Sequence, residues 1–192
     1  MWGVGEYRNP VAYTARPGLH PKKKTLIAQE RDEEARTAWR VEIAAVDPDR
    51  LVFLDETGVS TKLVPTFARA PRGMRAVGSV PQARHHRSTL LATLTTSGMG
   101  ACVVFKGALD QVVFDAFVDQ FLVPALIPGQ IVVLDNLNVH KSAHARQAIA
   151  NARCELRFLP TYSPDLNPIE LANSVYKHRM RRLRPRSHEE VI

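Results

Sequence analysis

Two short runs of apolar residues each end on an aspartate. Residues 51–54 read Leu-Val-Phe-Leu and precede Asp55, and residues 131–134 read Ile-Val-Val-Leu and precede Asp135. A short, unbroken apolar run between turn residues is typical of a buried strand. We therefore predict two buried strands, each with a carboxylate at its carboxyl end.

Other segments repeat their apolar residues with the spacing of a helix. In the first of them Ala35, Trp39 and Ile43 fall on one stripe, which predicts a helix that packs on the sheet. In the second, Asp115 and Asp119 lie one turn apart opposite the apolar rows, and we expect them on a solvated face rather than in a metal site. The predicted helices span residues 28–46, 109–126 and 142–151, and a last one starts near Pro168.

The remaining strands complete an α/β pattern. Residues 89–96 and 101–105 flank a Ser-Gly-Met-Gly turn and predict a hairpin, and residues 156–159 predict a last short strand. Strands that alternate with helices favour an α/β domain built on a mixed sheet. Residues 1–27 show no periodicity, so we expect a tail or inter-domain linker there and one domain over residues 28–192.

Composition excludes several classes of protein. No apolar run approaches the roughly 20 residues of a transmembrane helix, and the amino terminus lacks the pattern of a secretory signal. Cys102 and Cys154 are too few for a disulfide scaffold, and because both lie in apolar stretches we expect two buried free thiols. These features predict a cytoplasmic domain in a reducing compartment, with no membrane partner.

The positive charge is concentrated in two windows that contain no acid. The chain has 26 Lys+Arg and 19 Asp+Glu, a formal net charge of +7. No acidic residue lies between Glu56 and Asp110, or between Glu170 and Glu189. Such windows favour nucleic acid as a partner, with a merely solubilising face as the alternative. The candidate DNA-binding residues are Arg69, Arg72, Arg75, Arg84, Arg87, Lys177, Arg181 and Arg182.

The two strand-end aspartates are the leading candidates for chemistry. In open α/β sheets ligand sites gather at the carboxyl ends of strands, so Asp55 and Asp135 meet there if their strands are parallel neighbours. Glu170, in the first turn of the last helix, is the candidate third carboxylate. Three carboxylates form an oxygen-rich site for Mg²⁺ or Mn²⁺, and two such ions support phosphodiester chemistry. The alternative is that these carboxylates lie at element ends incidentally.

Three ordered motifs resemble those of a known enzyme family. Leu-Val-Phe-Leu-Asp-Glu-Thr-Gly at residues 51–58 resembles the first acidic motif of DDE transposases, in the insertion-sequence branch of the mariner superfamily. Val-Leu-Asp-Asn at residues 133–136, followed by His140, resembles the second motif. Leu-Pro-Thr-Tyr-Ser-Pro-Asp-Leu-Asn-Pro-Ile-Glu at residues 159–170 resembles the third motif and is the most specific of them.

This resemblance implies an RNase H-like fold, a mixed five-stranded sheet flanked by helices. It also implies that Asp55, Asp135 and Glu170 bind two Mg²⁺ or Mn²⁺ ions, and that the protein cuts DNA at transposon ends and joins it to a target. The implied partners are double-stranded DNA, with the protein on the nucleoid when bound, and a second copy of the chain. Asn136 and His140 match motif positions. Asn136 could orient Asp135 or a phosphate, and His140 could contact DNA, support the site or make only a local hydrogen bond.

Other features leave alternatives open. Glu56 adjoins the first candidate ligand, but strand alternation points it to the opposite face, and we expect a structural role for it. Members of the family usually carry an aromatic residue three positions after the glutamate, where this chain has Asn173, so weaker docking of the last helix is expected. The chain also begins within what resembles an inter-domain linker, without the expected helix-turn-helix region, and its catalytic domain ends short. A DNA-binding remnant without catalysis, or another RNase H-like nuclease, therefore remains an alternative.

Overall fold

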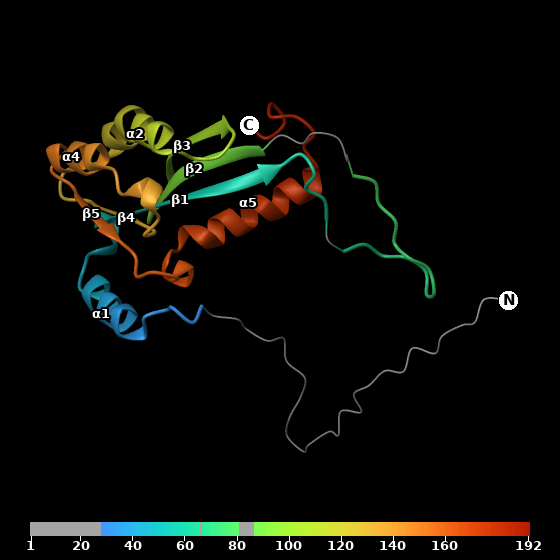
Figure 1. The fold of residues 1–192 in the computed structure, drawn as a ribbon, viewed down its shortest axis with the longest axis horizontal. Coiled ribbons are helices and arrows are strands. Elements are labelled where there is room, and N and C mark those ends of the chain that lie inside the picture. The colour runs from blue at the N-terminus through green and yellow to red at the C-terminus, as the bar shows by residue number, and fades with distance from the viewer. Residues whose placement is uncertain (1–27, 66, 81–86) are drawn as a thin grey trace, which may run out of the picture.

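A five-stranded mixed sheet forms the centre of the molecule in the computed structural model, which describes residues 28–65, 67–80 and 87–192 (Figure 1). The strand order is β3-β2-β1-β4-β5. β1 pairs in antiparallel fashion with β2 and in parallel with β4, and β4 is parallel to β5. This is the mixed α/β sheet that the sequence predicts. The strands are β1 (Leu51–Ser60), β2 (Arg87–Thr95), β3 (Gly98–Lys106), β4 (Ile131–Leu134) and β5 (Glu155–Phe158).

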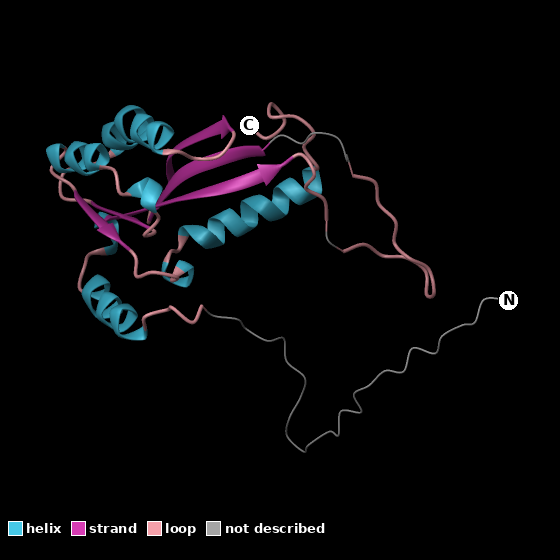
Figure 2. Ribbon diagram, in the orientation of Figure 1, coloured by secondary structure: helices cyan, strands magenta, loops and turns pink. Residues whose placement is uncertain are grey.

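Helices cover both faces of the sheet (Figure 2). Val52 and Leu54 of β1 pack with Phe114 and Ile149 on one face, and Leu51, on the other, packs with Trp39. Trp39 therefore packs on the sheet as its stripe predicts. The helices are α1 (Glu33–Ala44), α2 (Gln111–Phe117), α3 (Val123–Ala125), α4 (Ala143–Asn151) and α5 (Ile169–Leu183), with a π-helical segment (Val118–Leu122) between α2 and α3.

The predicted second helix, residues 109–126, is in fact a succession of three helical segments. The π-helical segment interrupts the regular hydrogen-bonding pattern, and Pro124 follows within α3. Phe114, Val118 and Leu122 are the buried row, whereas Phe121 of the other row is 40% exposed. Asp119 is exposed as expected, and its carboxylate lies 2.9 Å from His144 Nε2 of α4, whereas Asp115 is only partly exposed and its Oδ1 is buried, contrary to the expectation of a solvated pair.

The predicted strand ending at Asp55 is too short. β1 continues to Ser60, because β2 supplies antiparallel partners from Phe53 to Ser60. The Thr57-Gly58 pair, which reads as a turn in the sequence, therefore lies inside the strand. A Cβ on Gly58 would meet the Arg87 side chain at 2.8 Å, so this position in β1 accommodates the Arg87 guanidinium that lies across it.

Two other expectations are also wrong. The first helix begins at Glu33 rather than near residue 28, because Asp32 caps it by accepting a hydrogen bond from the Ala35 backbone N–H. Cys102 is exposed, since β3 is an edge strand, and only Cys154 is buried; both thiols are free.

Residues 61–65 and 67–80, here called the arm, extend from the end of β1 away from the body of the molecule (Figure 1). From Phe67 to Ser79 every residue of the arm is exposed. At the other end of the chain Val191 packs against Val59 and Met180, which fixes the carboxyl-terminal segment near the far end of α5. Within the described ranges, no helix is long and apolar enough to cross a membrane.

Candidate active site

Strand register aligns the first two candidate carboxylates. β1 and β4 pair in parallel with Leu51 opposite Ile131 and Phe53 opposite Val133. Asp55 lies two residues after Phe53 in β1, and Asp135 lies two residues after Val133, directly after the end of β4. The two strands are the parallel neighbours on which the sequence argument depended, and both aspartates lie where the parallel pairing ends.

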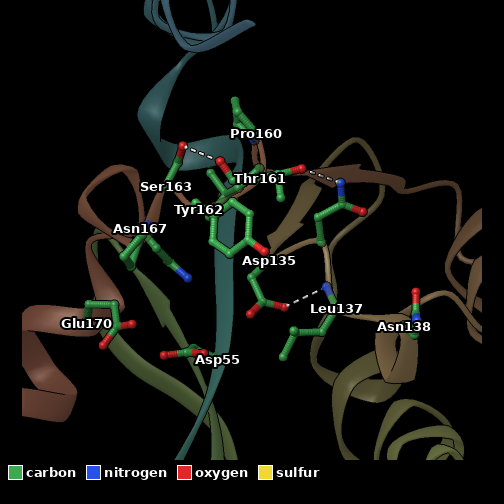
Figure 3. Close-up of a pocket in the computed structure, with 13 residues that line it drawn as sticks. Asp55, Asp135, Leu137, Asn138, Pro160, Thr161, Tyr162, Ser163, Asn167 and Glu170 are labelled. Atoms are coloured by element: carbon green, nitrogen blue, oxygen red, sulfur yellow. Dashed lines mark hydrogen bonds between the residues drawn. The ribbon is translucent and has the colours of Figure 1, made fainter. Parts of the chain in front are cut away.

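These two aspartates and Glu170 line one pocket of about 410 Å³ (Figure 3). Asp55 is buried, Asp135 is partly exposed and Glu170 is exposed at the start of α5. Figure 3 shows the carboxylates of Asp55 and Glu170 facing each other below Asp135. The structure therefore brings together the three carboxylates singled out in the sequence.

The segment of the third motif forms the opposite wall of this pocket. Residues 159–164 and Asn167 line it, between the end of β5 and the start of α5. Tyr162 adopts a left-handed backbone conformation with φ of 54°, and a 3-10 turn, η4 (Pro164–Leu166), follows. The backbone N–H of Glu170 then donates to the Asn167 carbonyl over 3.1 Å, so this turn sets where Glu170 begins the helix.

Negative charge accumulates around Asp55. Burial, together with repulsion by Glu170, Glu56 and Asp135, raises the pKa of Asp55 from 3.8 to about 7. A divalent cation would relieve this repulsion, and carboxylate oxygens are the donors that Mg²⁺ and Mn²⁺ prefer.

The residues present therefore fit such an ion in charge and in donor type. In the arrangement observed, no three histidine, cysteine, aspartate or glutamate side chains of the described residues lie close enough to hold one ion.

His140 connects Asp135 to Glu56. It belongs to the short 3-10 helix η3 (Asn138–His140), its side chain is fully buried, and its ring lies 5.0 Å from that of Phe114. Its Nδ1 lies 2.6 Å from Asp135 Oδ1, and its Nε2 lies 3.2 Å from Glu56 Oε2. Burial alone would lower the pKa of His140, but its contacts with Asp135 and Glu56 outweigh burial and raise this pKa to about 9.

The burial of His140 favours a supporting role at the site over direct contact with DNA, and Glu56 contacts the same ring. A fully buried imidazole is not on the surface that DNA would touch. Glu56 does point away from Asp55, as strand alternation predicts, yet it reaches the pocket indirectly through His140. Asn136 lies at the rim of the pocket, with its Nδ2 3.4 Å from Thr161 Oγ1.

Asn173, the position at which weaker docking of α5 is expected, lies buried against the sheet. It is 2% exposed, and its Nδ2 donates a hydrogen bond of 2.7 Å to Asp55 Oδ2. Asn173 thus contacts the sheet through a hydrogen bond, where the aromatic residue usual in the family would make apolar contacts. This finding removes one argument for a remnant without catalysis.

An ion pair between a buried arginine and an exposed aspartate, which sequence reasoning missed, supports the third motif. Arg36 of α1 is fully buried, and its guanidinium makes two hydrogen bonds to the Asp165 carboxylate, of 3.0 Å and 2.6 Å. Asp165 lies in η4, directly before α5. The only sequence signal was an arginine beside an apolar stripe, which ordinarily indicates a solvated position.

The candidate DNA-binding residues that the structure describes lie apart from the pocket, and none of the described residues that line it is a lysine or arginine. Arg69, Arg72 and Arg75 are exposed on the arm. Lys177, Arg181 and Arg182 lie on the second half of α5, whose far end lies near the base of the arm (Figure 1). Arg87 begins β2, and Arg84 lies outside the described residues.

Comparisons with known proteins agree on a fold. Residues 50–192 match the family model described as DDE superfamily endonuclease. A search of curated proteins with the sequence gives no match.

Two solved structures illustrate the likeness. The Mos1 transposase paired-end complex with left transposon end has a TM-score of 0.74 and 18% identity, over 91% of this chain and 57% of that one. The catalytic domain of Mos1 mariner transposase has a TM-score of 0.59 and 16% identity, over 88% and 81% of the two chains. The expected RNase H-like fold is confirmed, and the chain spans little more than half of the length of the transposase in the first complex.

Proposed function

Because this chain belongs to the DDE superfamily of endonucleases, we propose that it is the catalytic domain of a transposase that cuts DNA at transposon ends and joins it to a target. The observation that carries this proposal is the placement of Asp55, Asp135 and Glu170 around one pocket. In this proposal the catalytic domain spans residues 28–192, and residues 1–27 form a tail or linker.

Asp55, Asp135 and Glu170 would hold two Mg²⁺ or Mn²⁺ ions. Bound there, the ions would supply Lewis acidity for phosphodiester chemistry, which cuts DNA by attack of water and joins it by attack of a 3′-hydroxyl. Related structures of the mariner Mos1 paired-end complex were obtained with Mg and with Mn, which supports this choice of cation.

The neighbouring residues have supporting roles in the proposal. His140 orients Asp135 by holding its Oδ1, and Glu56 fixes the ring from the other side. Asn136, at the pocket rim beside Asp135, is available to a phosphate of the DNA.

Double-stranded DNA would extend from the pocket along α5 towards the arm. Lys177 to Arg182 begin seven residues after Glu170, so at a rise of about 1.5 Å per residue they lie roughly 10–18 Å further along the helix. Arg69, Arg72 and Arg75 lie beyond them, and Arg84 and Arg87 complete the proposed set. The Mos1 complexes with transposon ends support DNA as the partner. We further propose that the chain acts as a homodimer on DNA, in the cytoplasm and on the nucleoid.

A cleavage assay with one matched variant tests this function. The purified chain with Mg²⁺ or Mn²⁺ is expected to nick DNA, and Asp135→Asn is expected to reduce nicking by at least about a hundredfold, because it removes a ligand charge. Asp119→Asn, at an exposed aspartate of the π-helical segment that does not line the pocket, is the control and should cut at the wild-type rate. Equal nicking by wild type and Asp135→Asn would contradict the proposal.

A further inference from the structure

The contact between Asn173 and Asp55 joins α5 to the centre of the sheet. Asn173 lies three residues after Glu170, so helix geometry places both side chains on neighbouring positions of one face. The two residues nevertheless sit differently. Glu170 is exposed at the pocket rim, whereas Asn173 is buried beneath it against β1.

The hydrogen bond accounts for a buried amide in this position. A polar side chain buried without a partner costs roughly 1–3 kcal/mol, so Asn173 would be unfavourable between α5 and β1 without the Asp55 carboxylate. In return, the amide occupies Oδ2 of Asp55 and thereby restricts rotation of the carboxylate. Each of the two residues therefore fixes the other.

The chemical type of the donor matters as much as its position. An amide donates a hydrogen bond without adding charge, whereas lysine or arginine in its place would neutralise Asp55 and compete with a cation. The repulsion that Asp55 experiences from the neighbouring carboxylates thus remains available to attract a metal ion. An aliphatic residue would remove the side-chain donor to Oδ2 of the buried Asp55 carboxylate.

We propose that Asn173 is a positioning residue of the metal site, which holds Asp55 by one oxygen so that the other is presented towards Asp135 and Glu170. This inference rests on the proposed function. Residues that hold a metal ligand in place typically alter metal affinity by about 10–100-fold when they are replaced. Asn173 should therefore affect metal affinity much more than it affects the fold.

Asn173→Leu tests the role because leucine has a similar shape but no donor. The matched control is Tyr176→Phe, which removes a hydroxyl from the same helix that has no hydrogen-bond partner among the described residues. Three quantities are measured: the Mn²⁺ dissociation constant by calorimetry without DNA, the Mg²⁺ concentration for half-maximal DNA nicking, and the melting temperature of the metal-free chain.

Asn173→Leu is expected to weaken Mn²⁺ binding by about tenfold or more and to raise the Mg²⁺ midpoint similarly, with a melting temperature within a few degrees of wild type. Tyr176→Phe should leave both metal measurements unchanged. If Asn173→Leu does not fold, Asn173→Ala is measured in the same way. Unchanged metal binding in a folded Asn173 variant, with or without a lower melting temperature, would overturn the positioning role.

The same measurements separate this inference from the proposed function. If wild type neither binds Mn²⁺ nor nicks DNA, the proposed function fails, and the role of Asn173 falls with it. If wild type binds and cuts while Asn173→Leu does both equally well, only the role of Asn173 is refuted.

Discussion

Asp55 is the most enclosed of the three carboxylates that line the pocket, and its ionisation opposes folding. Its pKa is raised by folding, so between pH 3.8 and about 7 the folded chain binds the proton more tightly than the unfolded chain does. The contribution of Asp55 to stability therefore decreases as the pH rises through this window, and above it the destabilisation is complete.

Asp55→Asn should consequently stabilise the metal-free chain at pH 8, by roughly 2–4 kcal/mol or about 5–10 °C in melting temperature. The difference from wild type should shrink as the pH is lowered through the window and vanish about one pH unit below 3.8, because the wild-type carboxyl is protonated in both states only below both pKa values. Thermal melts at several pH values measure it. Glu34→Gln, which removes an exposed carboxylate from α1, serves as the control; a pH-independent difference for Asp55→Asn would contradict the prediction.

Some residues of the site could be predicted from the local sequence, and others could not. Asp55 and Asp135 carry a local signal, since an apolar run that ends on an acid is visible within five positions. Arg36 and Asn173 carry none, because their partners Asp165 and Asp55 lie 129 and 118 positions away in the chain. Only the fold brings such pairs together, and each residue taken alone resembles a solvated helix position.

Among the elements, α1 and the start of α5 depend on each other through one ion pair. Arg36 holds Asp165 with two parallel hydrogen bonds, and the turn that contains Asp165 sets the beginning of α5. A planar guanidinium provides this two-point geometry, and an ammonium group does not. The position of Glu170 thus depends on a helix that contributes no residue to the pocket.

Arg36→Lys is therefore expected to lower the free energy of unfolding by about 1–2 kcal/mol, since one charged hydrogen bond is lost while Asp165 keeps partial access to water. Urea unfolding measures the change. Arg40→Lys, the same substitution at an exposed position of α1, should have no measurable effect. Equal losses in the two variants would show that the paired hydrogen bonds do not stabilise α5.

Element boundaries were less predictable than the elements themselves. The hairpin of β2 and β3, the buried strand β4 and the start of the last helix are confirmed within a few positions, because apolar patterns and turn residues are local. The length of β1 was underestimated for a different reason. Its extension to Ser60 depends on the partner β2, and the Thr57-Gly58 pair provides a turn signal that antiparallel pairing overrides.

At the scale of the whole molecule, the acidic pocket and the basic residues lie at different ends of α5. The carboxylates lie at its start, whereas its basic residues and those of the arm lie towards the other end (Figure 1). This separation keeps lysine and arginine away from the acidic pocket, where they would neutralise it. It also predicts that DNA affinity and metal affinity vary independently.

Two triple variants test that independence: Arg69, Arg72 and Arg75 to Gln on the arm, and Lys177, Arg181 and Arg182 to Gln on α5. Each is expected to weaken DNA binding and to reduce the slope of log affinity against log salt by up to about three, or about one per lost phosphate contact. Fluorescence anisotropy across a salt series measures the slopes, and Mn²⁺ binding should not change. Arg40→Gln is the control, and a slope that stays at the wild-type value would exclude that surface from the DNA interface.

The positions of Asp55 and Asp135 at matching points of β1 and β4 limit where homologous chains can gain or lose residues. Successive side chains of a strand point to opposite faces, so one residue inserted into or deleted from residues 51–55 or 131–135 would turn its aspartate out of the pocket. The described residues of the arm belong to no strand, so we expect changes in its length to leave both carboxylates in place. Insertions and deletions among homologous chains should therefore collect in the arm, while the spacing of the two strands stays fixed.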